Sequence, residues 1–337
     1  MEDAHSIIVP FAGVRGQGFF AIFDGHAGKA AAEWCGQFFA PSLVNALRRD
    51  PESPIPDLLN QTFHDVDSKL SKLSEESDGK MHSGCTVVTA FLRLEDEHGG
   101  QSYLPSGFEL PPVQVSVGAT TSSKEDGKSD DDSKSKGTTS KLMNAIKSIG
   151  GTSSPSGSSL SGDTVSSPPA PSPCTDNAVT PPSSVRRVLY CANAGDARGV
   201  LCRAGKAVRL TYDHKGSDKQ EAKRITDAGG FVMSGRVNGV LAVTRSLGDS
   251  SMKEFVVGSP YTTETELNEQ DEFLILACDG LWDVVNDQGA VDLARSIVDP
   301  RKAAEELLNY AYSNYSTDNV TVLVVRFREP PAGVAKE

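Results

Sequence analysis

Short apolar runs alternate along the chain with polar turns, and their lengths separate strands from helices. The runs Gly18–Phe23 and Cys85–Leu94 are too short for helices and rich in aromatic and β-branched residues, so they predict strands buried on both faces. Later runs of the same kind predict further strands at Val188–Ala194, Gly199–Arg203, Ala207–Leu210, Phe273–Cys278 and Val320–Phe327.

Apolar residues at helical spacing predict helices between these strands. One helix is expected over Lys29–Leu47, where Pro41 should break or kink it. Another should begin at Ser217 as its N-cap and end at Gly229. The remaining helices are expected around Leu58–Leu73, Gly289–Val298 and Lys302–Tyr312. Because strands often follow one another directly, the order favours an α+β sandwich over a doubly wound sheet.

The composition changes to Ser, Thr, Gly, Pro and mixed charge over 95–186. Such a segment cannot bury enough apolar surface to offset the entropy of ordering, so it predicts a disordered insertion. The insertion would interrupt one domain over 1–330, with a tail over 331–337. We expect it to regulate or recruit and to leave the stability of the fold unchanged. Its apolar residues Leu142, Met143, Ile146 and Ile149 are either a partner-binding face or a chance cluster.

Charge and cysteine usage limit the classes of partner and compartment. A formal net charge of -12 argues against nucleic acid as a partner, because phosphate backbones are bound by an excess of Lys and Arg. No stretch has the roughly 18 apolar residues of a bilayer span, and no basic-then-apolar leader is present. The six cysteines form no C-x-x-C pair and are expected to be reduced, buried thiols. We therefore expect a cytoplasmic or nuclear protein that does not bind membranes.

Acidic residues recur where predicted strands end or begin. Asp24-Gly25 and Asp279-Gly280 each follow an apolar strand, Asp196 follows another, and Asp318 precedes the last strand. A buried strand holds its terminal carboxylate rigidly, and glycine allows the backbone carbonyl to approach a ligand. A single Asp-Gly is more often an ordinary turn. Several converging carboxylates would repel one another without a cation, so the pattern favours a site for Mg²⁺ or Mn²⁺.

Nine segments together resemble the type 2C (PPM) protein phosphatases, and fungal members in particular. They cover nearly all of the chain outside the insertion and occur in the family order: MEDAH, FAIFDGHAG, SGCTVV, ANAGDAR, LTYDHK, AGGFV, RVNGVLAVTRSLGD, ILACDGLWDVV and TDNVTV. The resemblance implies a four-layer α-β-β-α sandwich of two mainly antiparallel sheets flanked by helices. It also implies a metal-dependent phosphatase that hydrolyses phosphoserine and phosphothreonine in proteins.

The resemblance also implies the residues of two cation sites. Glu2, Asp24 and the carbonyl of Gly25 resemble the ligands of one cation. Asp24, Asp279 and Asp318 resemble the ligands of the other, so that Asp24 bridges the two. A third, weaker cation would lie at Asp196 and Asp283.

Two further residues resemble groups that act on the water and on the leaving group. Asp3 resembles a carboxylate that orients the attacking water, and His26 resembles the general acid. For His26 alone, an ordinary hydrogen-bonded loop histidine is the simpler interpretation, and the adjacent Asp24-Gly25 makes the catalytic one preferable. The implied partners are phosphorylated proteins, among them MAP kinases or other stress-pathway kinases, and the protein is expected to be a monomer.

Family members usually carry a phosphate-binding arginine a few residues before the glutamate that matches Glu2. Met1 opens that motif here, so the arginine is absent and reduced activity is one alternative. A pseudophosphatase that keeps the fold as a binding module is another, although the matching carboxylates are all present. A cysteine-dependent phosphatase is disfavoured because no cysteine has an arginine six residues later. A metal-dependent nuclease is disfavoured because the chain lacks a basic stripe.

Overall fold

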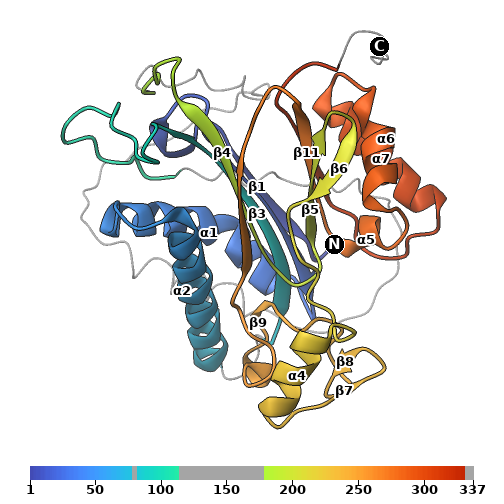
Figure 1. Cartoon of the computed structure of the whole chain (residues 1–337). Helices are drawn as coiled ribbons and strands as arrows, with labels where there is room; N and C mark the ends of the chain where they lie inside the picture. The colour runs from blue at the N-terminus through green and yellow to red at the C-terminus, as the bar shows by residue number, and fades with distance from the viewer. Residues whose placement is uncertain (78–81, 114–177, 331–337) are drawn as a thin grey trace, which may run out of the picture. The chain divides into compact units, whose positions relative to one another are not determined.

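Two antiparallel sheets form the centre of the part of the chain that the computed structural model describes, residues 1–77, 82–113 and 178–330 (Figure 1). The six-stranded sheet contains β1 (Ala4–Ile8), β2 (Gly18–His26), β3 (Gly84–Glu95), β4 (Arg186–Ala194), β9 (Leu247–Gly248) and β10 (Tyr261–Glu266). The four-stranded sheet contains β5 (Arg198–Arg203), β6 (Lys206–Arg209), β11 (Asp271–Ala277) and β12 (Val322–Arg326). The short strands β7 (Val232–Met233) and β8 (Arg236–Val237) form a separate hairpin.

Helices cover the outer face of each sheet. The helices are α1 (Ala30–Arg49), α2 (Ile55–Glu76), α4 (Lys219–Asp227), α5 (Asp279–Trp282), α6 (Asp287–Arg295) and α7 (Pro300–Ser313), and Phe11–Gly13 and Ser250–Met252 form 3₁₀ turns. Helices α1 and α2 pack on the six-stranded sheet, and α5 to α7 pack on the four-stranded sheet. Among the helices of the described residues, none combines the length and apolar content of a bilayer span.

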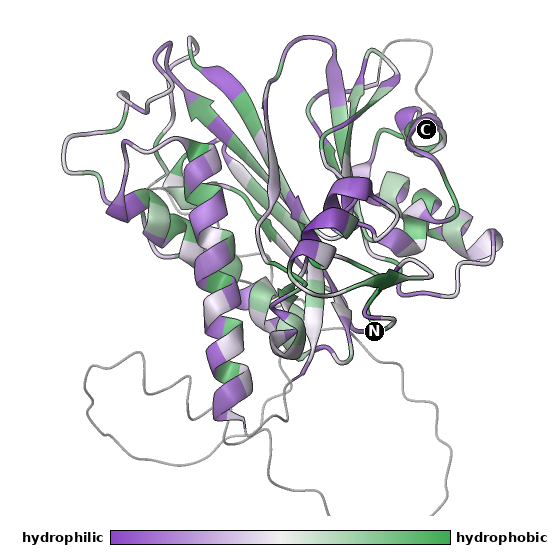
Figure 2. Ribbon diagram, turned by 60° about the horizontal axis from the view of Figure 1, so that its bottom comes forward, coloured by the Kyte–Doolittle hydropathy of each residue, from purple (hydrophilic) through white to green (hydrophobic). Residues whose placement is uncertain are grey.

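Period-two alternation along the strands produces three apolar layers. On β2, Phe19 and Phe23 face α1, whereas Phe20 and Ile22 face the other sheet. Strand β11 alternates in the same way between the helices and the layer between the sheets. In Figure 2 many residues of the strands are hydrophobic (green). The helices mix hydrophobic and hydrophilic residues, because only one side of each helix is buried. This arrangement confirms the predicted four-layer α-β-β-α sandwich.

Two local predictions about helices are wrong. A break at Pro41 is wrong, because helix α1 continues through it; the flanking Ala40, Ser42 and Leu43 are buried, and their packing offsets the roughly 3 kcal/mol that an interior proline costs. The N-cap of α4 is Asp218, whose side chain accepts the backbone N–H groups of Gln220 and Glu221, and not Ser217. The two adjacent residues have similar capping chemistry, so the sequence pattern alone does not choose between them.

Free, buried thiols are confirmed for the cysteines that the structure describes. They are Cys35, Cys85, Cys191, Cys202 and Cys278. Cys174 lies outside the described residues.

Part of the segment expected to be disordered packs on the domain. Leu110 and Val113 contact the apolar layer under α1, and the Tyr103 hydroxyl donates to the Leu94 carbonyl at 2.9 Å. On the other side of the insertion, Val179 forms a bridge with Val14. The ordered portion therefore includes 96–113 and 178–185. The predicted partner-binding face at Leu142–Ile149 lies outside the described residues.

Two deletions should distinguish how much the packed part of this segment and the rest of it contribute to stability. We expect replacement of 114–177 by a short Gly-Ser linker to leave the melting temperature nearly unchanged, because the composition of this segment favours solvation. A wider deletion of 99–183 should lower the melting temperature, because it removes Leu110, Val113 and Val179. Differential scanning fluorimetry would compare both. Equal melting temperatures for the two deletions would show that the packed loop contributes nothing.

Candidate active site

Strand β2 positions three predicted site residues at its end. It pairs antiparallel with β3 as far as His26, so Asp24, Gly25 and His26 lie opposite Thr86, Cys85 and Gly84. The predicted strand end at Phe23 is therefore too early. These three residues are half-buried at the edge of the apolar layers, where a rigid backbone sets their direction.

The four-stranded sheet brings its acidic residues to one end. Asp279 begins α5 directly after β11, and Asp318 precedes β12, the antiparallel neighbour of β11. Gly280 lets the two connections approach, because a Cβ there would lie 2.1 Å from the Asn319 carbonyl oxygen. Asp283 caps the same short helix α5 and is exposed.

The N-terminal segment is tied to both sheets. The Glu2 backbone N–H donates to Asn319 Oδ1 at 2.6 Å, and Glu2 Oε2 accepts the Gly28 N–H at 3.1 Å. Asp3 Oδ2 accepts the Thr321 hydroxyl at 2.6 Å. A Cβ on Gly25 would lie 2.4 Å from the Glu2 carbonyl oxygen, so only glycine allows this approach.

Electrostatic coupling shows that the carboxylates lie near one another. Burial, followed by the charges of neighbouring acids, raises the pKa of Asp24 to about 9; these neighbours are Asp279, Asp3, Asp196 and Asp318. Burial and the same kind of repulsion raise the pKa of Asp279 to about 7. Burial also raises the pKa of Asp196, although the Lys215 ammonium opposes the shift. The strand ends therefore converge on one acidic cluster.

This acidic cluster fits a hard divalent cation by its chemistry. Its donors are all oxygens, and Asp3 Oδ1 is buried without a hydrogen-bond partner in the described part of the chain. Neighbouring carboxylates that raise one another's pKa would be relieved by added positive charge. Within residues 1–77, 82–113 and 178–330, no three His, Cys, Asp or Glu side chains already stand as a metal-binding group.

Two residues that the sequence interpretation did not select contact predicted site residues. Lys215 Nζ lies 3.2 Å from Asp196 Oδ2 and 3.5 Å from Asp283 Oδ1. Asp249 Oδ2 lies 2.7 Å from His26 Nε2. Both residues belong to quoted segments, LTYDHK and RVNGVLAVTRSLGD, so the motifs contained the signal. The contact of Lys215 with Asp283 crosses 68 positions and that of Asp249 with His26 crosses 223, which is why local spacing could not reveal them.

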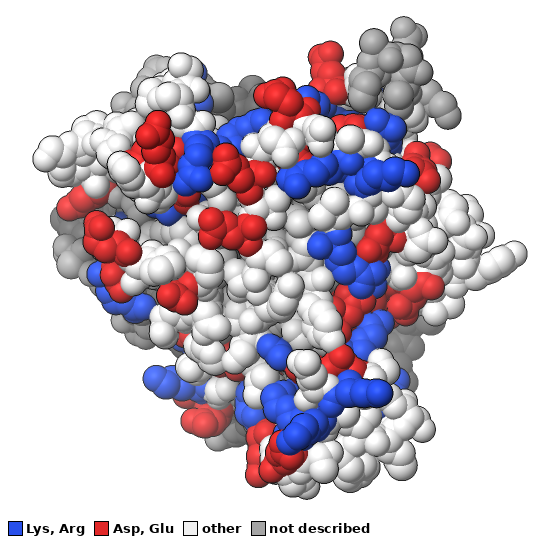
Figure 3. Space-filling model, viewed as in Figure 1, with Lys and Arg blue, Asp and Glu red and all other residues white. Residues whose placement is uncertain are grey.

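A flap formed by α4 and the β7–β8 hairpin borders the lower end of the domain in Figure 1. Glu221 anchors it, since its side chain accepts Arg245 Nη2 at 2.5 Å and the Thr244 hydroxyl at 2.8 Å. Figure 3 shows Lys and Arg gathered at this end, where Lys219 and Arg236 are exposed. Acidic side chains, among them the exposed Asp227 of α4, lie between them, so the surface beside the flap is of mixed charge.

His214 should make stability depend on pH. It is buried behind the flap, and burial, with a smaller contribution from Arg245, lowers its pKa from 6.5 to about 4. The unfolded chain then binds the proton more tightly, so folding stability is complete above pH 6.5 and falls as pH drops toward 4. The full loss corresponds to about 3 kcal/mol.

Urea unfolding at pH 7 and pH 5 would measure this dependence. His214→Gln should flatten the difference between the two pH values, because it removes the titrating group. Parallel pH dependences for the variant and the wild type would contradict the assignment. Comparing the two proteins cancels the titration of the acidic cluster, which both contain.

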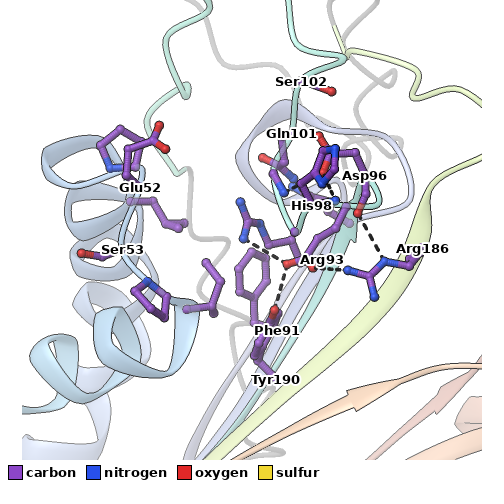
Figure 4. Close-up of a pocket in the computed structure, with 18 of the residues that line it drawn as sticks. Glu52, Ser53, Phe91, Arg93, Asp96, His98, Gln101, Ser102, Arg186 and Tyr190 are labelled. Atoms are coloured by element: carbon purple, nitrogen blue, oxygen red, sulfur yellow. Dashed lines mark hydrogen bonds and ion pairs between the residues drawn. The ribbon is translucent and has the colours of Figure 1, made fainter.

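A pocket of about 820 Å³ lies elsewhere, between the α1–α2 turn and the C-terminal end of β3 (Figure 4). Its polar wall contains Glu95, which pairs with Arg93 at 3.0 Å and accepts the Tyr190 hydroxyl at 2.9 Å. None of the predicted site residues lines it. The acidic cluster lies where β3 begins, so the pocket is not the candidate active site.

Comparison with known proteins identifies the family. The family model described as "Protein phosphatase 2C" matches residues 1–97 and 127–320 of this chain. Protein phosphatase 2C homolog 1 of Schizosaccharomyces pombe is 37% identical over 332 residues, covering 98% of this chain and 70% of that protein. Protein phosphatase 2C homolog 1 of Saccharomyces cerevisiae is 38% identical over 327 residues, covering 96% of this chain and 87% of that protein.

Solved structures share the fold. A Caenorhabditis elegans sex-determining protein aligns with a TM-score of 0.65 and 21% identity, covering 99% of this chain and 62% of that one. A Toxoplasma gondii phosphatase aligns with a TM-score of 0.60 and 22% identity, covering 98% and 90%. With the family match and the fungal relatives, these findings confirm the predicted fold and the predicted activity on phosphorylated proteins. The chain belongs to the protein phosphatase 2C family, whose members are metal-dependent, and is a protein serine/threonine phosphatase.

Proposed function

We propose that this chain hydrolyses phosphoserine and phosphothreonine directly with water at the acidic cluster, without a covalent phosphoenzyme. The observation that carries the proposal is the convergence of the strand ends, which buries Asp24 beside four other carboxylates whose charges raise its pKa. An uncompensated cluster of this kind is costly to a fold, so a cation-dependent use is the simplest reason for its presence.

The proposed ligands divide into three groups. Glu2, Asp24 and the carbonyl of Gly25 would hold one Mg²⁺ or Mn²⁺. Asp24, Asp279 and Asp318 would hold the second. Asp196 and Asp283 would contribute to a third, weaker site, at the place where Lys215 now lies between them. When bound, the cations would offset phosphate charge and make a water molecule nucleophilic near neutral pH.

The other side chains act on the water and on the leaving group. Asp3 is held by the Thr321 hydroxyl and keeps a second oxygen free, so it can accept a hydrogen bond from the attacking water and orient it. His26 lies two positions beyond Asp24 at the end of β2 and would donate a proton to the departing serine or threonine oxygen.

We further propose a role in restraining kinase signalling, with MAP kinases or other stress-pathway kinases among the substrates. Every proposed site residue comes from this one chain, so a monomer suffices for activity. The five described cysteines are free and buried, a pattern typical of a reducing compartment such as the cytoplasm or the nucleus.

Phosphate release from a phosphothreonine peptide tests the proposal. We expect release with added Mn²⁺ or Mg²⁺ and none in excess chelator. A protein that binds the cation and remains folded but releases no phosphate would instead be a binding module. Robust hydrolysis in excess chelator would contradict the role proposed for the acidic cluster.

A further inference from the structure

A buried carboxylate contacts the proposed general acid. Asp249 Oδ2 lies 2.7 Å from His26 Nε2, and the Asp249 side chain is 8% exposed, compared with 26% for His26. The two residues are separated by 223 positions in the sequence. Burying a carboxylate is costly unless it is paired and hydrogen-bonded, so the contact with His26 offsets part of the cost of burying Asp249.

Asp249 is held by its own segment. The Ser246 hydroxyl donates to the same Oδ2 atom that faces His26. The Asp249 backbone adopts φ 48°, a left-handed conformation that non-glycine residues rarely adopt. A residue kept in this conformation needs support from its surroundings, and such positions cluster at functional sites.

Helix α2 and strand β3 supply that support. Gly248 pairs with Gly84 across β9 and β3, and its N–H donates to Asp67 Oδ1 of α2 at 2.9 Å. Lys253 Nζ joins the same Asp67 at 2.7 Å and donates to the Ser246 carbonyl at 3.0 Å. The loop that carries Asp249 is therefore fixed on two sides.

Gly84 keeps the space between the two side chains open. A Cβ at this position would lie 2.2 Å from Asp249 Oδ2 and 2.5 Å from His26 Nε2. The pair therefore packs directly over the backbone of β3, where any side chain would separate it. The backbone of Gly84, the hydroxyl of Ser246 and the contacts with Asp67 of α2 therefore all favour the pairing of Asp249 with His26.

We propose that Asp249 is a positioning residue for His26. An ionised carboxylate only accepts hydrogen bonds, so it holds one His26 proton on Nε2 and leaves Nδ1 as the ring nitrogen that can face the reacting group. When His26 acts as the general acid it carries a second proton on Nδ1, and this is the proton donated to the departing oxygen. It also holds the ring plane while the substrate enters. This inference rests on the general-acid role proposed for His26.

Leaving-group dependence distinguishes positioning from simple structural support. Asp249→Asn keeps the shape but removes the negative charge and replaces one of the two acceptor oxygens with an NH₂ donor. We expect kcat on a phosphothreonine peptide to fall by roughly 10- to 100-fold with little change in KM. On p-nitrophenyl phosphate, whose leaving group scarcely needs a proton, kcat should change by less than about threefold. In a His26→Ala background, Asp249→Asn should cause no further loss on the peptide.

Two further variants keep the test decisive. Asp271→Asn is the matched control. Asp271 is also a buried carboxylate, but it pairs with Arg203 at the start of β11, the end of that strand away from Asp279. It should lower the melting temperature without any selectivity between the two substrates. Ser246→Ala removes a single hydroxyl beside Asp249 and should give a smaller loss with the same selectivity. It decides the question if Asp249→Asn does not fold.

Each outcome has a separate meaning. Equal losses on both substrates for Asp249→Asn, or an additional loss in the His26→Ala background, would overturn the positioning role. If His26→Ala itself shows equal losses on both substrates, the general-acid proposal fails first and the inference falls with it. The positioning role would be supported if Asp249→Asn and His26→Ala each lose activity selectively on the peptide and the double variant loses no more than His26→Ala alone.

Discussion

Replacing Asp24 by asparagine should abolish hydrolysis of a phosphothreonine peptide and at the same time leave the metal-free protein at least as stable as the wild type. Burial, followed by the charges of Asp279, Asp3, Asp196 and Asp318, raises the pKa of Asp24 to about 9. The variant removes the charge that both proposed cation sites share, and it also relieves repulsion within the cluster. Phosphate release with saturating Mn²⁺ and the melting temperature in chelator would measure the two effects.

The opposite directions of these effects make the result informative. Most inactivating substitutions destabilise a fold, so a lost activity alone could reflect unfolding. Asp271→Asn serves as the control, because Asp271 is paired with Arg203 and its loss should lower the melting temperature without loss of activity. Asp279→Asn and Asp318→Asn should behave like Asp24→Asn. A folded Asp24→Asn protein with wild-type turnover would show that the proposed ligand assignment is wrong.

Replacing His26 by alanine should lower kcat on the phosphothreonine peptide by roughly 10²- to 10⁴-fold, the usual contribution of a general acid. An alkyl alcohol is a poor leaving group and needs a proton as the bond to phosphorus breaks. The loss should shrink strongly on p-nitrophenyl phosphate, because its phenolate leaves without one. Steady-state kinetics on both substrates at saturating Mn²⁺ would test this.

Two observations would oppose that expectation. Identical losses on both substrates would mean that His26 supports binding or structure and does not transfer a proton. A loss confined to KM would place His26 in substrate binding. His98→Ala is a matched control, because His98 is an exposed histidine in the loop after β3, beside the pocket of Figure 4.

Most of the strands and helices could be predicted from the sequence, because the residues that they bury form local patterns along the chain. Aromatic and β-branched residues in Gly18–Phe23 and helical spacing in Leu58–Leu73 correspond to β2 and α2. The polar edge strand β10, whose sequence is YTTETE, was not predicted, since an edge strand with one exposed face shows little apolar signal. Its pairing with β4 supplies the missing hydrogen bonds.

The sequence by itself determined the chemistry of the site. Carboxylates at strand ends beside glycine identified Asp24 and Asp279 as candidates, and the family resemblance added Glu2, Asp3 and His26. The first of these inferences needs only residue type and local spacing, whereas the second rests on the resemblance to a known family. The continuous apolar runs that became β2 and β11 likewise predicted strands buried on both faces.

Only the tertiary structure decided which of these groups meet. Glu2 lies beside Asn319, and His26 lies beside Asp249, across separations of 317 and 223 positions. Such contacts depend on how two sheets and α2 pack together, and no local pattern records that packing. The same packing raises the pKa of Asp24, because desolvation and repulsion exist only once the strand ends converge. The kinds of side chain are therefore a property of the sequence, whereas their coupling is a property of the fold.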